Sequence, residues 1–159
     1  MEMGKPQQEH DWLQQMVGEW TYESEMQGPE GTVKYTGSET VRSLGGLWVI
    51  GEGTGEMPGG GSATMIITLG YDTEAQKFVG TWIGSMMTKM WVYDCEMDPD
   101  GRTLRLNAEG PSMSGSGKIV QYQDSVEVVD ENTRKFYGRV QDDDGNWVTF
   151  MTANYRRVS

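Results

Sequence analysis

The sequence has few of the residues on which common enzyme chemistries depend. Its 159 residues include one cysteine, Cys95, and one histidine, His10. A single cysteine excludes an intrachain disulfide and a multi-cysteine metal site within one chain, and it suits a reducing compartment. His10 lies at the start of the one helical segment, where we expect it on the surface, so Ser–His and Cys–His pairs have no base at hand. No predicted strand carries a histidine that could bind haem iron. We therefore expect no catalytic residue, no metal and no cofactor.

Basic residues and long apolar runs are also scarce. Lys and Arg number 13 against 24 Asp and Glu, which gives a formal net charge of -11. Such a balance repels phosphate backbones and anionic membrane surfaces, so neither nucleic acid nor a membrane is an expected partner. The chain starts MEMGKPQQEHDW, without the basic start and apolar run of a secretory signal, and no stretch approaches the roughly 20 apolar residues of a membrane span. We expect a cytoplasmic protein.

The pattern that is present is that of β-strands. Helical spacing of apolar residues is confined to HDWLQQMVG, where Trp12, Leu13, Met16 and Val17 share one side. From Gly18 onward, β-branched and aromatic residues recur in short runs separated by Gly, Pro, Asp and Asn turn residues. We predict ten strands, over residues 18–26, 32–43, 47–56, 63–71, 77–84, 89–97, 102–109, 117–129, 134–141 and 147–157.

A meander of this length must either leave two sheet edges open or close on itself. The sequence has no crossover helices, and one short helix cannot cover an open sheet of about ten strands. Closure removes the edges. We therefore predict an all-β fold, an antiparallel up-and-down β-barrel of about ten strands with the short N-terminal helix plugging one end. Residues 1–159 are expected to form a single domain, with the N-terminal segment and helix over 1–17 and the barrel over 18–159.

Two glycine-rich stretches lack the features of a nucleotide-binding loop. GEGTGEMPGGG opens no helix, and GPSMSGSGKIV has no hydroxyl residue after Lys118. We interpret both as mobile loops, with Gly59-Gly60-Gly61 as a candidate flap at the barrel mouth. DPDG and DDDG predict hairpin turns with glycine in the left-handed conformation.

The run GTWIGSMMTKMWVY, residues 80–93, gathers large apolar side chains in an acidic protein. As one strand its 14 residues would span about 46 Å, which exceeds the wall of a small barrel. We predict a hairpin with Met86 and Met87 as its loop, which sets Ser85 opposite Thr88, Trp82 opposite Trp91, Gly80 opposite Tyr93 and Phe78 opposite Cys95. The face with Trp82, Trp91 and Tyr93 is expected to point inward. These rings either line a ligand pocket, with the flexible methionines at its rim, or fill a solid core.

Charged residues in the second and third predicted strands offer a polar feature for the interior. Glu39, Arg42 and Glu52 lie close together in the sequence. Strand carboxylates usually point outward, but one Arg–Glu pair inside the barrel would orient the polar head of a ligand. We keep such a pair as an alternative.

The chain resembles, over nearly its whole length, the bacterial family known as domain of unknown function 1579. The resemblance rests on HDWLQQMVGEW, GSETVRSLGGLWVIGEGTGEMPGGG, ITLGYD, FVGTWIGSMM and FMTANYRR. It implies a lipocalin-like, calycin-type barrel and no assigned activity. In lipocalins an arginine from the end of the barrel covers the tryptophan of the first strand. The resemblance thus implies a structural floor in which Arg156 or Arg157 covers Trp20 by a cation–π contact.

The leading functional hypothesis is non-catalytic binding of a small apolar or amphipathic molecule inside the barrel. One alternative is a small enzyme that acts on a lipid-like substrate through buried carboxylates and Tyr. Another is a structural or oligomerisation module without a ligand. In ATMIITLGY, Met65, Ile67 and Leu69 lie on one strand face and Ile66 on the other, which favours a homodimer through the outer face.

Overall fold

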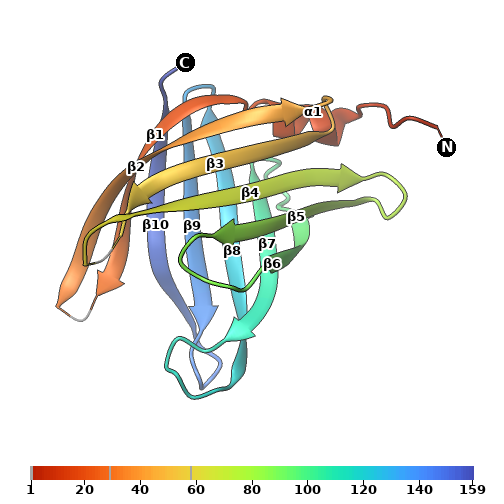
Figure 1. Ribbon diagram of the computed structural model, residues 1–159. Coiled ribbons are helices and arrows are strands. Elements are labelled where there is room, and N and C mark those ends of the chain that lie inside the picture. Colours follow the sequence, from red (N-terminus) through yellow and green to blue (C-terminus); the bar gives the residue numbers. More distant parts are fainter. Residues whose placement is uncertain (1, 29, 58) are drawn as a thin grey trace.

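The computed structural model describes residues 2–28, 30–57 and 59–159 (Figure 1). Two prolines in predicted turn regions, Pro29 and Pro58, lie outside the described residues, as does Met1. The described residues form one helix and ten strands: α1 (Gln8–Gln14), β1 (Gly18–Gly28), β2 (Gly31–Leu44), β3 (Trp48–Glu56), β4 (Ser62–Asp72), β5 (Lys77–Gly84), β6 (Trp91–Met97), β7 (Thr103–Pro111), β8 (Ile119–Asp130), β9 (Thr133–Gln141) and β10 (Trp147–Arg157).

The ten strands form a closed antiparallel barrel in which each strand pairs with its neighbours in sequence. Pairing of β1 with both β2 and β10 closes the ring. In Figure 1, β3, β4 and β5 cross the front of the molecule, and β8, β9 and β10 run behind them in a steeply different direction. The predicted fold class is confirmed, and every predicted strand bound agrees with the structure to within two residues.

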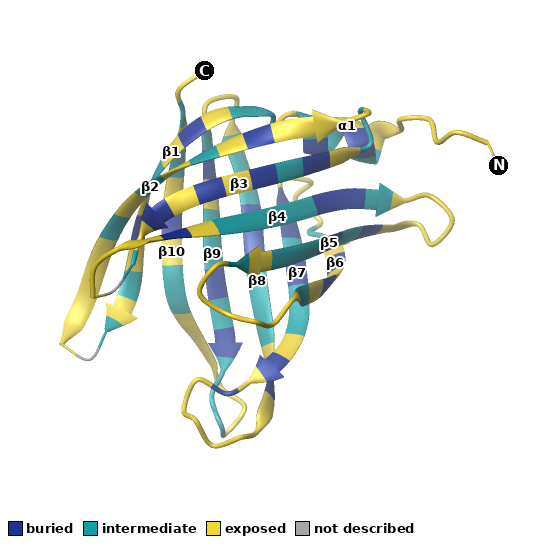
Figure 2. Ribbon diagram, in the orientation of Figure 1, coloured by how far each residue is buried: buried dark blue, intermediate teal, exposed yellow. Residues whose placement is uncertain are grey.

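Alternation of side chains explains why these segments form the barrel wall. Along β1, Trp20 and Ser24 are buried while the intervening residues are exposed or half-buried. The same two-residue period appears on β3 and β6, and Figure 2 shows it as alternating dark and light bands. Because successive strand residues point to opposite faces, one set of side chains lines the interior. The predicted turns DPDG and DDDG are confirmed, with Gly101 and Gly145 at φ values of 70° and 86°.

The helix α1 covers one end of the barrel. Leu13 is fully buried in the core, and Met16, just past the helix, is 3% exposed and accepts a hydrogen bond from the Trp20 indole through its carbonyl. The Trp12 indole donates to the carbonyl of Gly101 in the turn between β6 and β7, 2.9 Å away. These contacts tie the helix to both sides of the barrel end, as the predicted plug requires.

The expectation that His10 lies on the surface is wrong. Its side chain is only 2% exposed. The ring accepts a hydrogen bond at Nδ1 from the Gln7 backbone N–H, 2.9 Å away, and its Nε2 lies 3.1 Å from the Tyr71 carbonyl oxygen. The ring therefore joins the start of α1 to the end of β4. The single histidine anchors the helix, and it does not line the barrel cavity described below.

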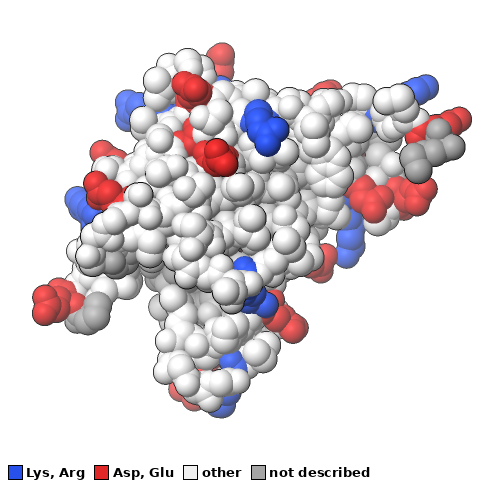
Figure 3. All heavy atoms as spheres, viewed as in Figure 1, with Lys and Arg blue, Asp and Glu red and all other residues white. Residues whose placement is uncertain are grey.

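The outer wall carries a small apolar area near the middle of the sheet. Ile66 on β4 lies opposite Ile83 on β5, and Ile83 is 40% exposed. Figure 3 shows that charged side chains on this side of the molecule lie mostly around its margins. The homodimer expected from Ile66 stays a prediction.

Among the described residues, no helix has the length and apolar character needed to cross a bilayer.

Candidate functional site

The barrel encloses a cavity of about 470 Å³ that opens at the end away from α1. Glycines on β3 create much of this space. The segment GEGTGE places Gly51, Gly53 and Gly55 at the inward positions of the strand, where no side chain fills the interior. Residues 51–56 belong to β3, which agrees with the strand predicted over 47–56 and not with the interpretation of the whole stretch as a loop. The glycine run Gly59–Gly61 does lie in the turn that follows, with positive φ at all three residues.

Each inward glycine of β3 has a different neighbour. A Cβ atom on Gly55 would stand 2.1 Å from the Tyr22 hydroxyl, and one on Gly37, its partner on β2, 2.3 Å from the same ring. The Tyr22 ring thus lies flat across two strands, and burial raises the pKa of its hydroxyl, assisted by Glu56. Of the three, only Gly53 could take a Cβ atom without a close approach, since its nearest neighbours would lie at 3.4 Å or more.

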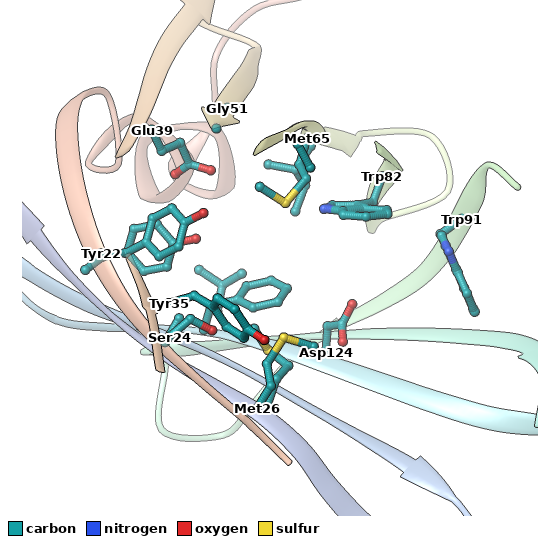
Figure 4. Close-up of a pocket in the computed structure, with 18 of the residues that line it drawn as sticks. Tyr22, Ser24, Met26, Tyr35, Glu39, Gly51, Met65, Trp82, Trp91 and Asp124 are labelled. Carbon is teal, nitrogen blue, oxygen red and sulfur yellow. The ribbon is translucent and has the colours of Figure 1, made fainter. Parts of the chain in front are cut away.

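Aromatic rings of the β5–β6 hairpin form another part of the wall. The structure places Trp82, Trp91 and Tyr93 on the inward face, where all three line the cavity. Figure 4 shows Trp82 and Trp91. The predicted register is confirmed for two pairs, Trp82 opposite Trp91 and Gly80 opposite Tyr93. The predicted two-residue loop is wrong: β5 ends at Gly84 and β6 starts at Trp91, so six residues connect them and Ser85 does not pair with Thr88. Ser85 instead bonds to Thr64 of β4, which draws the loop away from a tight turn.

Methionine is the most frequent residue type around the cavity. Met86 and Met87 stand at its rim, 40% and 44% exposed, as the hairpin predicted. The Trp91 indole donates to the Met87 sulfur, 3.3 Å away. Flexible thioether side chains adapt to ligands of different shape. Among the described residues, eight methionines line the cavity: Met16, Met26, Met57, Met65, Met86, Met87, Met113 and Met151.

An arginine–glutamate ion pair does lie inside the barrel, but not between the expected residues. Glu39 pairs with Arg134 of β9, and both side chains are at most 10% exposed. Arg42 and Glu52 are exposed on the outer wall, because each stands an odd number of residues from an inward position of its strand. Their assignment to the ligand site is therefore wrong. Burial lowers the pKa of Arg134 to about 10, which leaves the guanidinium charged at neutral pH.

A second carboxylate, Asp124 on β8, was not predicted from the sequence. Its Oδ2 accepts a hydrogen bond of 2.8 Å from the Tyr93 hydroxyl, and the group lines the cavity beneath Trp82 (Figure 4). Burial raises the pKa of Asp124 to about 6, although the bond from Tyr93 acts in the opposite direction. Burial also raises the pKa of the Tyr93 hydroxyl well above its ordinary value, so Tyr93 stays protonated and donates this bond.

The barrel floor is built from Trp20 and two arginines. The guanidinium carbon of Arg157 lies 4.4 Å from the Trp20 ring centre, and that of Arg134 lies 4.7 Å from it. Of the two residues expected to cover Trp20, Arg157 takes this position because it stands opposite Trp20 in the β1–β10 register. Arg156 is one residue out of phase and exposed, so its place in the floor is wrong.

Among the described residues, no group of three or more His, Cys, Asp or Glu side chains is placed to hold a metal ion. Cys95 is buried beside Tyr93, and burial raises the pKa of its thiol to about 12, so it stays protonated. The chemistry available in the cavity is therefore apolar contact, hydrogen bonding to tyrosines, and the charges of Glu39, Glu56, Asp124 and Arg134.

The fold and the cavity define a lipocalin-like barrel with an open interior. The family described as "Protein of unknown function (DUF1579)" matches residues 5–157, and the chain belongs to this family. Among curated proteins, none matches the chain.

Solved structures share the barrel fold at low sequence identity. Rv2717c from M. tuberculosis has a TM-score of 0.66 at 11% identity, covering 98% of this chain and 100% of its own. The S-type phycobiliprotein lyase CPES from Guillardia theta has a TM-score of 0.57 at 12% identity, covering 97% and 99%. A de novo designed fluorescence-activating barrel has a TM-score of 0.50 at 12% identity, covering 92% and 97%. These likenesses support the fold.

Proposed function

We propose that the protein binds a small apolar or amphipathic molecule inside its barrel without transforming it. The observation that carries this proposal is the cavity of about 470 Å³, which falls in the range of small-molecule sites. Glycines at the inward positions of β3 keep the interior open, where larger side chains would have filled it.

The lining agrees with a ligand that is mainly apolar. Rings such as Trp82 and Trp91 offer large contact areas, and the methionines at the rim adapt to what enters. A designed barrel with this fold is described as fluorescence-activating, which supports the idea that such an interior can hold a small molecule. Binding is favoured over acid–base catalysis because two of the three carboxylates that line the cavity already have partners: Glu39 is held by Arg134, and Asp124 accepts a hydrogen bond from the Tyr93 hydroxyl.

Titration with a neutral apolar dye such as Nile red tests the proposal. We expect saturable binding to the wild type, and about tenfold weaker binding to Trp82→Ala, the factor that corresponds to roughly 1–2 kcal/mol of lost apolar contact. Ile83→Ala is the matched control, because Ile83 is the next residue and points outward. Absence of saturable binding, or equal losses in the two variants, would contradict the proposal.

A further inference from the structure

Acidic groups outnumber basic ones around the cavity. Its charged residues are Glu39, Glu56 and Asp124 against the single Arg134. Arg134 and Glu39 neutralise each other as a buried ion pair. Within the described ranges, Asp124 has no cationic side chain within ion-pair distance. The cavity therefore carries an excess of negative charge whenever Asp124 is ionised.

One oxygen of Asp124 is free to meet a ligand. The Tyr93 hydroxyl occupies Oδ2. In the part of the chain that the structure describes, Oδ1 has no hydrogen-bond partner. The one fully buried side-chain atom there that lacks a partner is Arg134 Nε. Oδ1 is therefore not fully buried, and a ligand in the cavity can reach it. Gly138 on β9 stands opposite Asp124, and a Cβ atom there would come within 2.8 Å of Oδ1. The glycine leaves room for this oxygen.

Aromatic rings surround the same part of the cavity. Tyr122 precedes Asp124 by two residues on the inward face of β8. Its ring centre lies 4.8 Å from that of Trp91 and 6.3 Å from that of Phe150, and Phe150 packs over Gly138 beside Oδ1. The faces of such rings attract cations. Lys89 shows this attraction at the rim, where its ammonium lies 5.1 Å from the Trp91 ring centre.

We propose that the ligand is an amphipathic organic cation, with a protonated amine against Asp124 and its neighbouring rings and an apolar body along Trp82 and the methionines. This inference rests on the proposed binding function and adds the chemical class of the ligand. A carboxylate next to aromatic rings provides both a charge-assisted hydrogen bond and cation–π contacts for an ammonium group. A neutral or anionic head would leave the charge of Asp124 unpaired in an apolar site.

The floor offers less to an anion. Arg134 is bonded to Glu39, and its guanidinium carbon lies 4.0 Å from the Tyr155 ring centre and 4.7 Å from that of Trp20. Its Nε is fully buried and has no acceptor among the described residues. An anionic head at this N–H would compete with Glu39 for the same guanidinium.

Three probes with the same ten-carbon chain separate the possibilities: decylamine, decanol and decanoate. Isothermal titration calorimetry at pH 7.5 is expected to show decylamine binding at least about tenfold more tightly than decanol, the factor expected of a hydrogen bond between charged groups. In Asp124→Asn, which keeps the side-chain shape, the amine should bind no more tightly than the alcohol. Unchanged decanol affinity in this variant shows that the cavity is intact. Glu96→Gln, which removes a charge from the outer wall of β6, is expected to keep the preference.

The outcomes distinguish the two levels of the proposal. Equal binding of decylamine and decanol to the wild type, tightest binding of decanoate, or a preference for the amine that survives in Asp124→Asn would each overturn the cationic ligand while leaving the binding function in place. Failure of all three probes to bind would overturn the binding function, and the cationic ligand with it.

Discussion

Trp20 on β1 and Arg157 on β10 stand opposite each other in the strand register, and the guanidinium carbon lies 4.4 Å from the indole centre. The same guanidinium donates hydrogen bonds to three carbonyl oxygens, those of Val17, Gln15 and Glu131, at 2.6, 2.7 and 2.8 Å. One side chain therefore connects the segment after α1, the first strand, the last strand and the turn before β9. This connection closes the barrel at the end where the chain begins and finishes.

Arg157→Ala is expected to lower the stability of the protein by about 1–3 kcal/mol, because it removes the cation–π contact and leaves three carbonyls without their donor. In a protein of this size the melting temperature should fall by roughly 3–10 °C. Arg156→Ala is the matched control, since Arg156 is adjacent, carries the same charge and is exposed. Thermal unfolding followed by circular dichroism measures both. Equal melting temperatures for the two variants would show that Arg157 does not close the floor.

The strands could be predicted from the sequence because their signals are local. Two-residue alternation and turn residues mark each strand, and the shortness of the connections implies antiparallel neighbours. Helical spacing marked the plug, but it could not show that His10 is buried. That burial depends on the Tyr71 carbonyl, which is 61 residues away in the chain and close only in the folded barrel.

Most of the site that could be predicted came from one hairpin, and Glu39 was the one expected site residue outside it that lines the cavity. Trp82, Trp91 and Tyr93 follow from the register of residues 77–97, which the sequence pattern indicates. The pair Glu39 and Arg134 is 95 residues apart and joins strands that do not adjoin, so no local pattern reveals it. One signal was present and not used: the alternating glycines of GEGTGE indicate a strand whose inner face is empty.

Gly53 provides a test of the cavity that leaves its polar groups unchanged. It lies at an inward position of β3, and a Cβ atom there would meet only ordinary van der Waals contacts, with the Ser38 carbonyl oxygen at 3.4 Å and the Glu39 side chain at 3.8 Å, so a larger side chain is directed into the cavity. Gly53→Leu is expected to weaken binding of Nile red at least about tenfold, while the melting temperature stays equal or rises because a strand glycine is replaced. Thr54→Leu, at the next and outward position, should bind the dye like the wild type. Full binding by Gly53→Leu would place the dye outside the barrel.

Asp143 holds the loop over residues 112–118 at the open end of the barrel. Its carboxylate accepts hydrogen bonds from the hydroxyls of Ser112, Ser114 and Ser116, and these bonds hold the pKa of Asp143 below its ordinary value. The loop carries Met113, which lines the cavity. Asp143→Ala is expected to increase amide hydrogen exchange across this loop with little change in the strands.

Asp144→Ala removes the same charge one residue further on and is the control for this loop. The Asp144 side chain makes none of the hydrogen bonds to the three serines. If exchange in residues 112–118 rises equally in both variants, the serine contacts do not order the loop.

The ionisation of Asp124 should make the stability of the protein depend on pH in a defined direction. Burial raises its pKa in the folded state from the ordinary 3.8 to about 6. Between these two values the folded state binds more protons than the unfolded state, so stability falls as pH rises through this range and stays lower above it. The difference in pKa corresponds to at most about 3 kcal/mol.

Asp124→Asn removes this titration, because the amide is neutral at every pH. We therefore expect the variant to be more stable than the wild type at pH 8. The difference in stability should shrink as pH falls below about 6 and be small near pH 4. At that pH the folded wild type holds the proton on Asp124 and the unfolded chain has begun to bind it. Urea unfolding at several pH values measures the difference, and comparing the two proteins cancels the other titrating groups. Glu96→Gln, on the outer wall, should show no such pH-dependent gain. A difference between Asp124→Asn and wild type that is constant from pH 4 to 8 would mean that Asp124 keeps an ordinary pKa. Among the described residues, Asp124 has no cationic partner, and its ionisation is expected to lower the stability of the fold. Such a cost to stability is typical of residues that serve function, which agrees with the proposed role of Asp124 in binding a ligand.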